Sequence, residues 1–270
     1  MRLWKALDMK AIVVKIGGSL AMDEGKLLDF ACAAAEISKK RKLVIVHGGG
    51  KDINANIALL NEKAEFLNGL RVTTPAIMDM VEMTLSGKVN KKLVRMLLSN
   101  NANAAGISGI DAKLLEARKM EGKGNLGAVG DIFKVNANIL EVLLNAGITP
   151  VISPVSYGDG ISYNVNADTA ASEIAIALKA DCFILISDIN GVLDKNKQVI
   201  PLLNKELANN LIQSEVISGG MIPKVQSALE SMERGLKSIH IVGWENAESF
   251  KRQIEGKANS GTIFALVRQT

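Results

Sequence analysis

Apolar and polar residues alternate along the chain in blocks typical of strands, each followed by a block typical of a helix. Short, β-branched apolar runs predict buried strands, and apolar residues spaced three or four apart predict helices. The predicted strands are residues 11–16, 43–46, 149–155, 183–186 and 238–242. The predicted helices are about 26–39, 52–61, 75–99, 137–146, 169–179, 204–213 and 223–234, before a closing helix and strand. Residues 112–119 and 128–135 predict a hairpin over a glycine-rich loop, and Asn68-Gly69 predicts a shorter one.

This order of elements defines an α/β fold class. Strand–helix repeats imply a three-layer sandwich, with a mostly parallel central sheet and helices on both faces. The 270 residues contain no internal repeat or low-complexity linker, so we expect a single domain over residues 1–270. In such a sheet, ligands bind beyond the carboxyl ends of the strands.

The amino-acid composition limits the classes of molecule that the protein is expected to bind. With 48% hydrophobic and 22% charged residues, the chain is typical of a globular protein. A net charge of +4 and only 4% aromatic residues favour small anions over nucleic acid. Two cysteines and two histidines exclude a disulfide framework, a zinc motif and a histidine metal cluster. No apolar run is long enough for a membrane span and no signal peptide is evident, so we expect a cytoplasmic protein without a membrane partner.

Two glycine turns are the first candidates for chemistry. Gly17-Gly18-Ser19 and His47-Gly48-Gly49-Gly50 each stand between a predicted strand and a predicted helix. Glycine lets the backbone approach a ligand, and N–H groups at a helix start can hold an anion. Together the two turns predict a cradle for phosphate or carboxylate. The Gly-x-Gly-x-x-Gly string at 122–127 lacks the strand–helix context of a dinucleotide site, so it predicts a hairpin loop.

Several charged residues near these turns have two interpretations each. Lys15 and Lys224 either face solvent or are directed at the anion cradle. Asp168 either caps the helix at 169–179 or takes part in the chemistry. Arg71 alone is typical of a surface arginine, and Asp188–Gly191 is typical of a turn.

Six motifs in a fixed order add a family resemblance. They are Val14–Gly18, Val46–Gly50, Gly69–Thr73, Val81–Asn90, Tyr163–Asp168 and Gly219–Lys224. Any one motif is weak, but the ordered set closely resembles the acetylglutamate kinases of the amino acid kinase superfamily, over about residues 11–264.

The resemblance implies an ATP-dependent kinase that phosphorylates the side-chain carboxylate of N-acetyl-L-glutamate to an acyl phosphate in arginine biosynthesis. Mg²⁺ would bridge the phosphates, with no metal held by the protein alone. The residues that it assigns to catalysis are Lys15 and Lys224, which would neutralise the phosphoryl group, Gly18 and Gly49, which would donate N–H groups to it, and Asp168, which would hold both lysines. Arg71 and Asn164 would bind the substrate α-carboxylate, beside Gly49 and Gly50.

For the nucleotide, the resemblance implies a site built from two loops. Its residues are Asp188, Ile189, Asn190, Gly191, Val192, Leu193, Val216, Ile217 and Ser218. The chain would then divide into a substrate-binding and dimerisation lobe, about 11–182, and a nucleotide-binding lobe, about 183–270. A homodimer would form on helix 75–99, whose apolar residues cover more than one face.

The segment before the first strand bears on assembly and regulation. Met1–Leu7 would form only two helical turns, which is marginal for a helix, so we expect neither hexamers nor inhibition by arginine. Two alternatives remain at this point. One is a kinase acting on carrier-protein-linked aminoadipate or glutamate, and the other is a non-catalytic regulatory ligand-binding protein of the same fold. Intact Lys15, Asp168 and Lys224 argue against the second.

Overall fold

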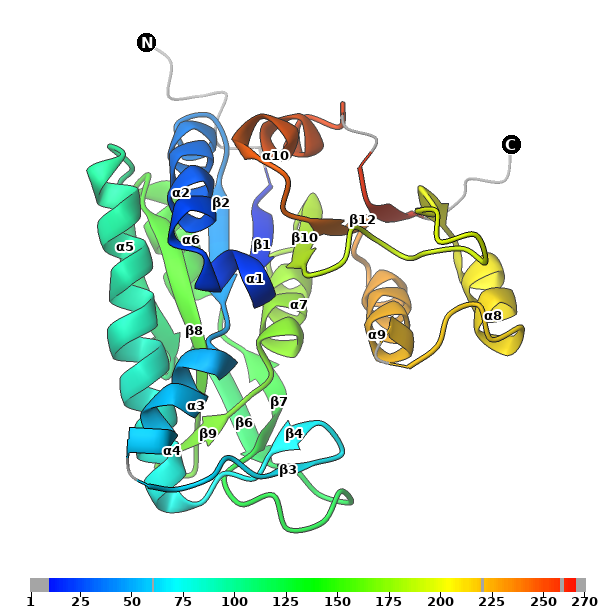
Figure 1. The fold of residues 1–270 in the computed structure, drawn as a ribbon. Coiled ribbons are helices and arrows are strands. Elements are labelled where there is room, and N and C mark those ends of the chain that lie inside the picture. Colours follow the sequence, from blue (N-terminus) through cyan, green and yellow to red (C-terminus); the bar gives the residue numbers. More distant parts are fainter. Residues whose placement is uncertain (1–9, 60, 220, 258–259, 266–270) are drawn as a thin grey trace.

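The computed structural model of the protein describes residues 10–59, 61–219, 221–257 and 260–265. Its centre is one long sheet flanked by helices (Figure 1). The strands follow the order β11 (Leu202–Leu203), β13 (Thr262–Ala265), β12 (Ser238–Gly243), β10 (Cys182–Ser187), β1 (Ile12–Ile16), β2 (Leu43–His47), β8 (Thr149–Gly158), β6 (Leu115–Lys119) and β7 (Gly130–Val135). Strands β5 (Ala104–Gly109) and β9 (Ile161–Asn164) also pair with β8, and β3 (Phe66–Leu67) with β4 (Leu70–Arg71) forms a separate hairpin.

The central strands are parallel, as the sequence predicts. Strands β10, β1, β2 and β8 pair in parallel, whereas β12–β13, β6–β7 and β8–β9 pair antiparallel. Lys15 lies opposite Val46 on β2 and Leu185 on β10. The carboxyl ends of β1, β2 and β10 are therefore aligned at one edge of the sheet, where a ligand is expected.

Helices cover both faces. They are α1 (Gly18–Met22), α2 (Glu24–Ser38), α3 (Gly50–Leu59), α4 (Pro75–Glu82), α5 (Asn90–Ser99), α6 (Asn138–Asn145), α7 (Ala167–Ala177), α8 (Lys205–Gln213), α9 (Met221–Glu233) and α10 (Ala247–Ile254). Alternate residues of β1 enter different cores: Val13 packs with Ile174 of α7, and Val14 packs with Phe30 of α2. Two apolar layers on one sheet confirm the predicted three-layer sandwich.

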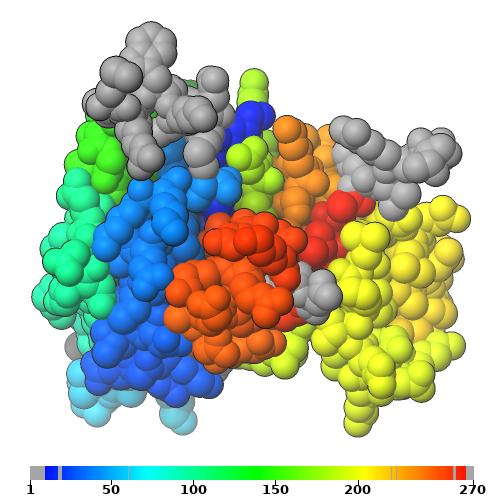
Figure 2. Space-filling model, turned by 90° about the horizontal axis from the view of Figure 1, so that it is seen from above, coloured from blue at the N-terminus to red at the C-terminus, as the bar shows by residue number. Residues whose placement is uncertain are grey.

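The two ends of the sheet carry different parts of the molecule. Seen from above, the segment around 75–100, which includes α5, lies at one end, and the yellow segment before and including α8 lies at the other (Figure 2). Figure 1 shows the same separation of α5 from α8 and α9. In the strand order, β1 lies between β2, which leads into the second glycine turn, and β10, which leads into residues 188–193.

Some elements differ from the sequence expectation. Strand β5 was not predicted, because Ala104–Gly109 contains two alanines and two glycines and becomes a strand only through its pairing with β8. Helix α1 and strand β9 were not predicted either. The helix expected at 75–99 is continuous, but its centre, η1 (Met83–Val89), is π-helical. The turns expected at Met1–Leu7 lie outside the described residues.

The interpretation of Asp168 as a helix cap is wrong. Helix α7 begins at Ala167, and its N-cap is Asn166, whose side chain accepts hydrogen bonds from the N–H groups of Asp168 and Thr169. Capping therefore does not explain Asp168.

Within the described ranges, no helix combines the length and the apolar character that crossing a bilayer requires.

Both histidines are buried, and this predicts acid sensitivity. Burial lowers the pKa of His47 to about 4 and that of His240 to about 4, against a usual value of 6.5. Between these values the unfolded chain binds protons that the folded protein does not, so the free energy of unfolding falls as the pH decreases from about 6.5 to about 4. At about 1.4 kcal/mol per pKa unit, the loss is on the order of 3 kcal/mol for each histidine.

Urea unfolding at about pH 7 and about pH 4.5 measures this effect. His240→Gln removes one of the two groups and should flatten the pH dependence. A free energy of unfolding that stays constant over this range would contradict the expectation.

Candidate active site

The first glycine turn holds a lysine in place. Lys15 is the fourth residue of β1, and its side chain folds back over Gly17, where an added Cβ would collide with Nζ. Lys15 Nζ forms an ion pair with Asp168 Oδ1 at 2.8 Å. The Lys15 side chain is only 14% exposed, so solvation does not account for its position at the strand end.

The second turn lies against the first. Gly48 N–H donates to the Ile16 carbonyl at 3.2 Å, and α3 begins at Gly50. An added Cβ on Gly49 would lie 2.6 Å from Leu85 Cδ2 and 3.3 Å from Val89 Cγ2, so glycine allows η1 to pack closely against the turn. The π-helical segment η1 therefore packs against the second glycine turn. Gly18, the other predicted N–H donor, is the first residue of α1.

Arg71 supplies a buried positive charge beside the second turn. It is 8% exposed, and its Nη2 donates to the Gly50 carbonyl at 3.1 Å. The guanidinium carbon lies 4.8 Å from the ring centre of Phe66. Burial lowers the pKa of Arg71, yet an arginine remains charged. Its Nη1 is buried and has no hydrogen-bond partner in the described part of the chain, which is uncommon for a buried polar atom.

Asn164 belongs to the same cluster through a threonine. Its Nδ2 donates to Thr73 Oγ1 at 3.0 Å, and that hydroxyl donates to the Arg71 carbonyl at 2.9 Å. The structure thus brings Arg71, Asn164, Gly49 and Gly50 into one neighbourhood. Thr73 was not predicted, since nothing in its local sequence marks a bridging hydroxyl.

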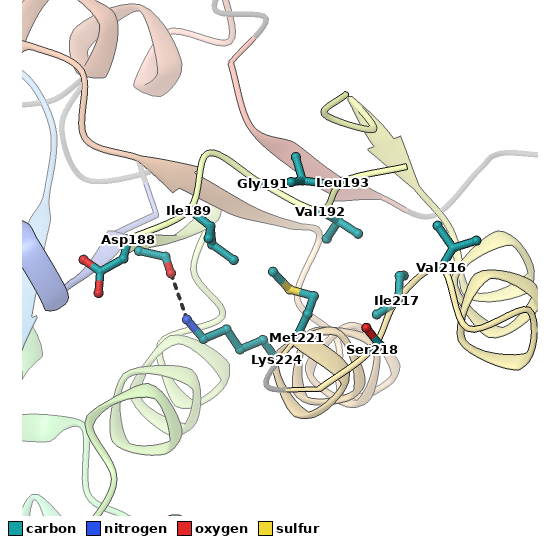
Figure 3. A pocket seen from close by; sticks show the side chains of 11 residues that line it. Asp188, Ile189, Gly191, Val192, Leu193, Val216, Ile217, Ser218, Met221 and Lys224 are labelled. Carbon is teal, nitrogen blue, oxygen red and sulfur yellow. Dashed lines mark hydrogen bonds between the residues drawn. The ribbon is translucent and has the colours of Figure 1, made fainter. Parts of the chain in front are cut away.

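A cleft of about 520 Å³ lies on the other side of β1 (Figure 3). It is lined by Ser187, Asp188, Ile189, Gly191, Val192, Leu193, Val216, Ile217, Ser218, Met221 and Lys224. Eight of the nine predicted nucleotide residues are in this set. The exception is Asn190, whose side chain packs against Gly243 instead. Sequence reasoning missed Ser187, which ends a strand outside the six motifs, and Met221, which lies within the Gly219–Lys224 motif but was assigned no role.

Lys224 enters this cleft from α9. Its Nζ donates to Ser187 Oγ at 2.8 Å, the bond drawn dashed in Figure 3. Ser187 ends β10 two residues after Leu185, which pairs with Lys15. The ammonium groups of the two lysines therefore lie near the carboxyl ends of the neighbouring strands β1 and β10. Asp168 is paired with Lys15, while the hydrogen bond of Lys224 is to Ser187.

The described residues contain no group of three or more His, Cys, Asp or Glu side chains that could hold a metal ion. A divalent cation at this site would therefore take most of its ligands from bound phosphates and water, which is how Mg²⁺ usually binds with nucleotides.

Comparisons with known proteins agree with this geometry. The sequence matches the amino acid kinase family over residues 10–243. It is 46% identical to the acetylglutamate kinase of Campylobacter hominis, over 86% of this chain and 83% of that protein. It is 42% identical to the acetylglutamate kinase of Caldanaerobacter subterraneus, over 96% of this chain and 88% of that protein. The fold also resembles that of N-acetylglutamate synthase from Neisseria gonorrhoeae, with a TM-score of 0.83 at 20% identity, over 96% of this chain and 60% of that one.

The family match and the curated relatives define a phosphotransferase, and its fold places the second glycine turn and the cleft on either side of a lysine-bearing strand. The chain belongs to the amino acid kinase family and, within it, to the acetylglutamate kinases.

Proposed function

We propose that the protein transfers the γ-phosphoryl group of ATP to the side-chain carboxylate of N-acetyl-L-glutamate. A carboxylate oxygen forms a bond to the γ-phosphorus as the bond to the β–γ bridging oxygen breaks, which yields an acyl phosphate and ADP. The observation that carries this proposal is the position of two lysines: Lys15 lies between the Arg71 turn and the cleft, and Lys224 lines the cleft with its Nζ on Ser187, at the end of the strand next to β1. We also propose that this acyl phosphate serves arginine biosynthesis, as the family resemblance implies.

The reaction requires mainly that the protein align the two substrates and stabilise the charge on the phosphoryl oxygens. A carboxylate is already ionised at neutral pH, so no general base is needed. Phosphoryl transfer depends mainly on alignment and on stabilising charge at the phosphoryl oxygens. We assign that stabilisation to Lys15, Lys224 and the N–H groups of Gly18 and Gly49. Asp168 orients the first lysine, and Ser187 orients the second.

The two substrates have separate sites in this proposal. The buried Arg71 guanidinium, with Asn164 beside it, binds the α-carboxylate of the acceptor. The apolar and glycine residues of the cleft hold the nucleotide, with Mg²⁺ on its phosphates. Residues 11–182 then form the substrate lobe and residues 183–270 the nucleotide lobe. We place this ATP-using enzyme in the cytoplasm.

A coupled assay of ADP release tests the proposal. N-acetyl-L-glutamate should support ADP release, whereas free glutamate and aspartate should not. If a carrier-protein-linked aminoadipate or glutamate were the true acceptor, only that conjugate would support turnover. A protein that binds ATP but releases no ADP with any of these acceptors would be the regulatory alternative.

Arg71→Lys separates acceptor binding from nucleotide binding. Lysine keeps the charge but cannot form two parallel bonds to a carboxylate. We expect the apparent KM for N-acetylglutamate to rise roughly 10–100-fold, the cost of a lost charge-assisted hydrogen bond, while the KM for ATP stays within about twofold. Steady-state kinetics with each substrate varied in turn measures this. Equal increases for both substrates would show that Arg71 is structural.

We also propose a homodimer through the helix at 75–99. Two apolar side chains on it are open to solvent in the single chain, Met83 at 57% and Leu98 at 49% exposed. An isologous contact would cover both, since each copy presents the same surface. Light scattering should give the mass of two chains, and Met83→Glu with Leu98→Glu should halve it. A monomer in the wild type, or a hexamer, would contradict this arrangement.

A further inference from the structure

Two fully buried polar side chains behind the second glycine turn have no role in the chemistry proposed so far. They are His47, the last residue of β2, and Asn90, the first residue of α5. Both are 0% exposed. Burying an imidazole and an amide is costly unless their polar atoms are bonded, so their partners show what they do.

The bond between them selects one form of the imidazole. Asn90 Nδ2 lies 3.2 Å from His47 Nε2. An amide nitrogen only donates, so Nε2 accepts and the ring hydrogen is on Nδ1. That Nδ1 lies 2.9 Å from the Gly48 carbonyl oxygen, to which it donates. Burial lowers the pKa of His47 to about 4, so the ring is neutral at pH 7.

Asn90 is itself held in one orientation. Its Nδ2 has two hydrogens: one is donated to the Val151 carbonyl on β8 at 2.8 Å, and the other is shared between His47 Nε2 at 3.2 Å and the Ile107 carbonyl on β5 at 3.3 Å. Its Oδ1 accepts from Lys91 Nζ at 3.1 Å. Turning the amide over would place its oxygen against two carbonyl oxygens, so the sheet determines which end of Asn90 meets the histidine.

The orientation of the His47 ring affects the candidate active site through the Gly48–Gly49 peptide bond. In a planar trans peptide, the carbonyl of Gly48 and the N–H of Gly49 point in opposite directions. Because His47 holds that carbonyl toward the buried side, the Gly49 N–H is turned away from it. Glycine permits many other backbone conformations, so this N–H has no fixed direction without such a restraint.

We propose that His47 and Asn90 are positioning residues: Asn90 selects the Nδ1–H form of His47, and His47 fixes the Gly48–Gly49 peptide so that its N–H faces the transferred phosphoryl group. The inference rests on the proposed kinase function. It gives a role to two motif residues that the reaction itself does not use.

Two substitutions of one residue test the contact that matters. Asparagine can bring its amide N–H close to the Nδ1 position of the ring, whereas glutamine reaches toward the Nε2 position. We expect His47→Gln to lower kcat about 10–100-fold, near the loss of one oxyanion donor, with the KM for ATP within about twofold. His47→Asn should retain kcat within about fivefold of wild type, because it can still donate to Gly48.

His240→Gln is the matched control. His240 is also buried and neutral, and it is held by Ser238 and Gln253 on the other side of the sheet's centre. It should leave kcat unchanged even if it destabilises the fold. An undiminished kcat in His47→Gln, or equal losses in His47→Gln and His240→Gln, would overturn the positioning role.

Nitrogen-15 NMR of the imidazole rings tests the tautomer without any assay of activity. The chain has only two histidines, so each ring can be assigned by deleting the other. Gln253 Nε2 donates to His240 Nδ1, so His240 should carry its hydrogen on Nε2, opposite to His47. Asn90→Leu should leave His47 in a mixture of forms. A wild-type His47 with its hydrogen on Nε2 would overturn the inference, whereas a wild type that releases no ADP with N-acetylglutamate would contradict the proposed function instead.

Discussion

Lys15→Ala and Lys224→Ala are each expected to lower kcat about 10²–10³-fold, the scale of losing one preorganised charge at a transition state. Both ammonium groups are placed before any ligand binds: Lys15 by Asp168 at 2.8 Å, and Lys224 by Ser187 at 2.8 Å. Such groups stabilise the charge that develops on the phosphoryl oxygens without having to reorganise. Stopped assays at saturating concentrations of both substrates measure the effect.

The control for these variants is Lys251→Ala. Lys251 forms ion pairs with Glu36 and Glu248 on the surface, and neither pair touches the site. Exposed ion pairs contribute about 0–1 kcal/mol to stability, so this variant should keep full activity and nearly wild-type unfolding. If both active-site variants turned over at the wild-type rate, the lysines would be binding groups and the mechanism would be wrong.

The architecture follows from local patterns, and so does much of the site. Buried β-branched runs and the glycine turns after them predict the parallel sheet, and the two loops at 188–193 and 216–218 do line one cleft. Gly69 illustrates the local chemistry: it adopts φ 77° in the predicted hairpin turn, where glycine is unstrained. These features depend on residues close together in sequence.

The sequence alone could not show contacts between segments that are far apart in the chain. Ser187 and Lys224 meet only because β10 and α9 converge on one cleft, and His47 and Asn90 only because α5 packs on β5 and β8, next to β2. Strand β5 shows the same limit. Gly106 within it leaves room for Asn90 and Lys91, since a Cβ there would lie 2.8 Å from Lys91 Nζ. A residue that looks like a weak strand former is thus required by its tertiary neighbours.

Asp168→Asn is expected to lower kcat sharply, by roughly 10-fold or more, with little change in stability. The substitution preserves shape but removes the charge that holds Lys15 Nζ. Helix α7 loses nothing at its start, because its cap is Asn166. The lysine would then be free to leave the phosphoryl position, so the rate should fall more than the affinity for either substrate.

Asp181→Asn is the matched variant for this test. Asp181 forms an ion pair with Arg41 at 3.4 Å, and its side chain is 38% exposed against 32% for Asp168. Both variants remove one partly exposed carboxylate from an ion pair, so both should unfold within about 1 kcal/mol of wild type. Only Asp168→Asn should lose activity, because Asp168 pairs with a lysine that we assign to the phosphoryl group and Asp181 does not. Loss of stability without loss of rate would return Asp168 to a purely structural role.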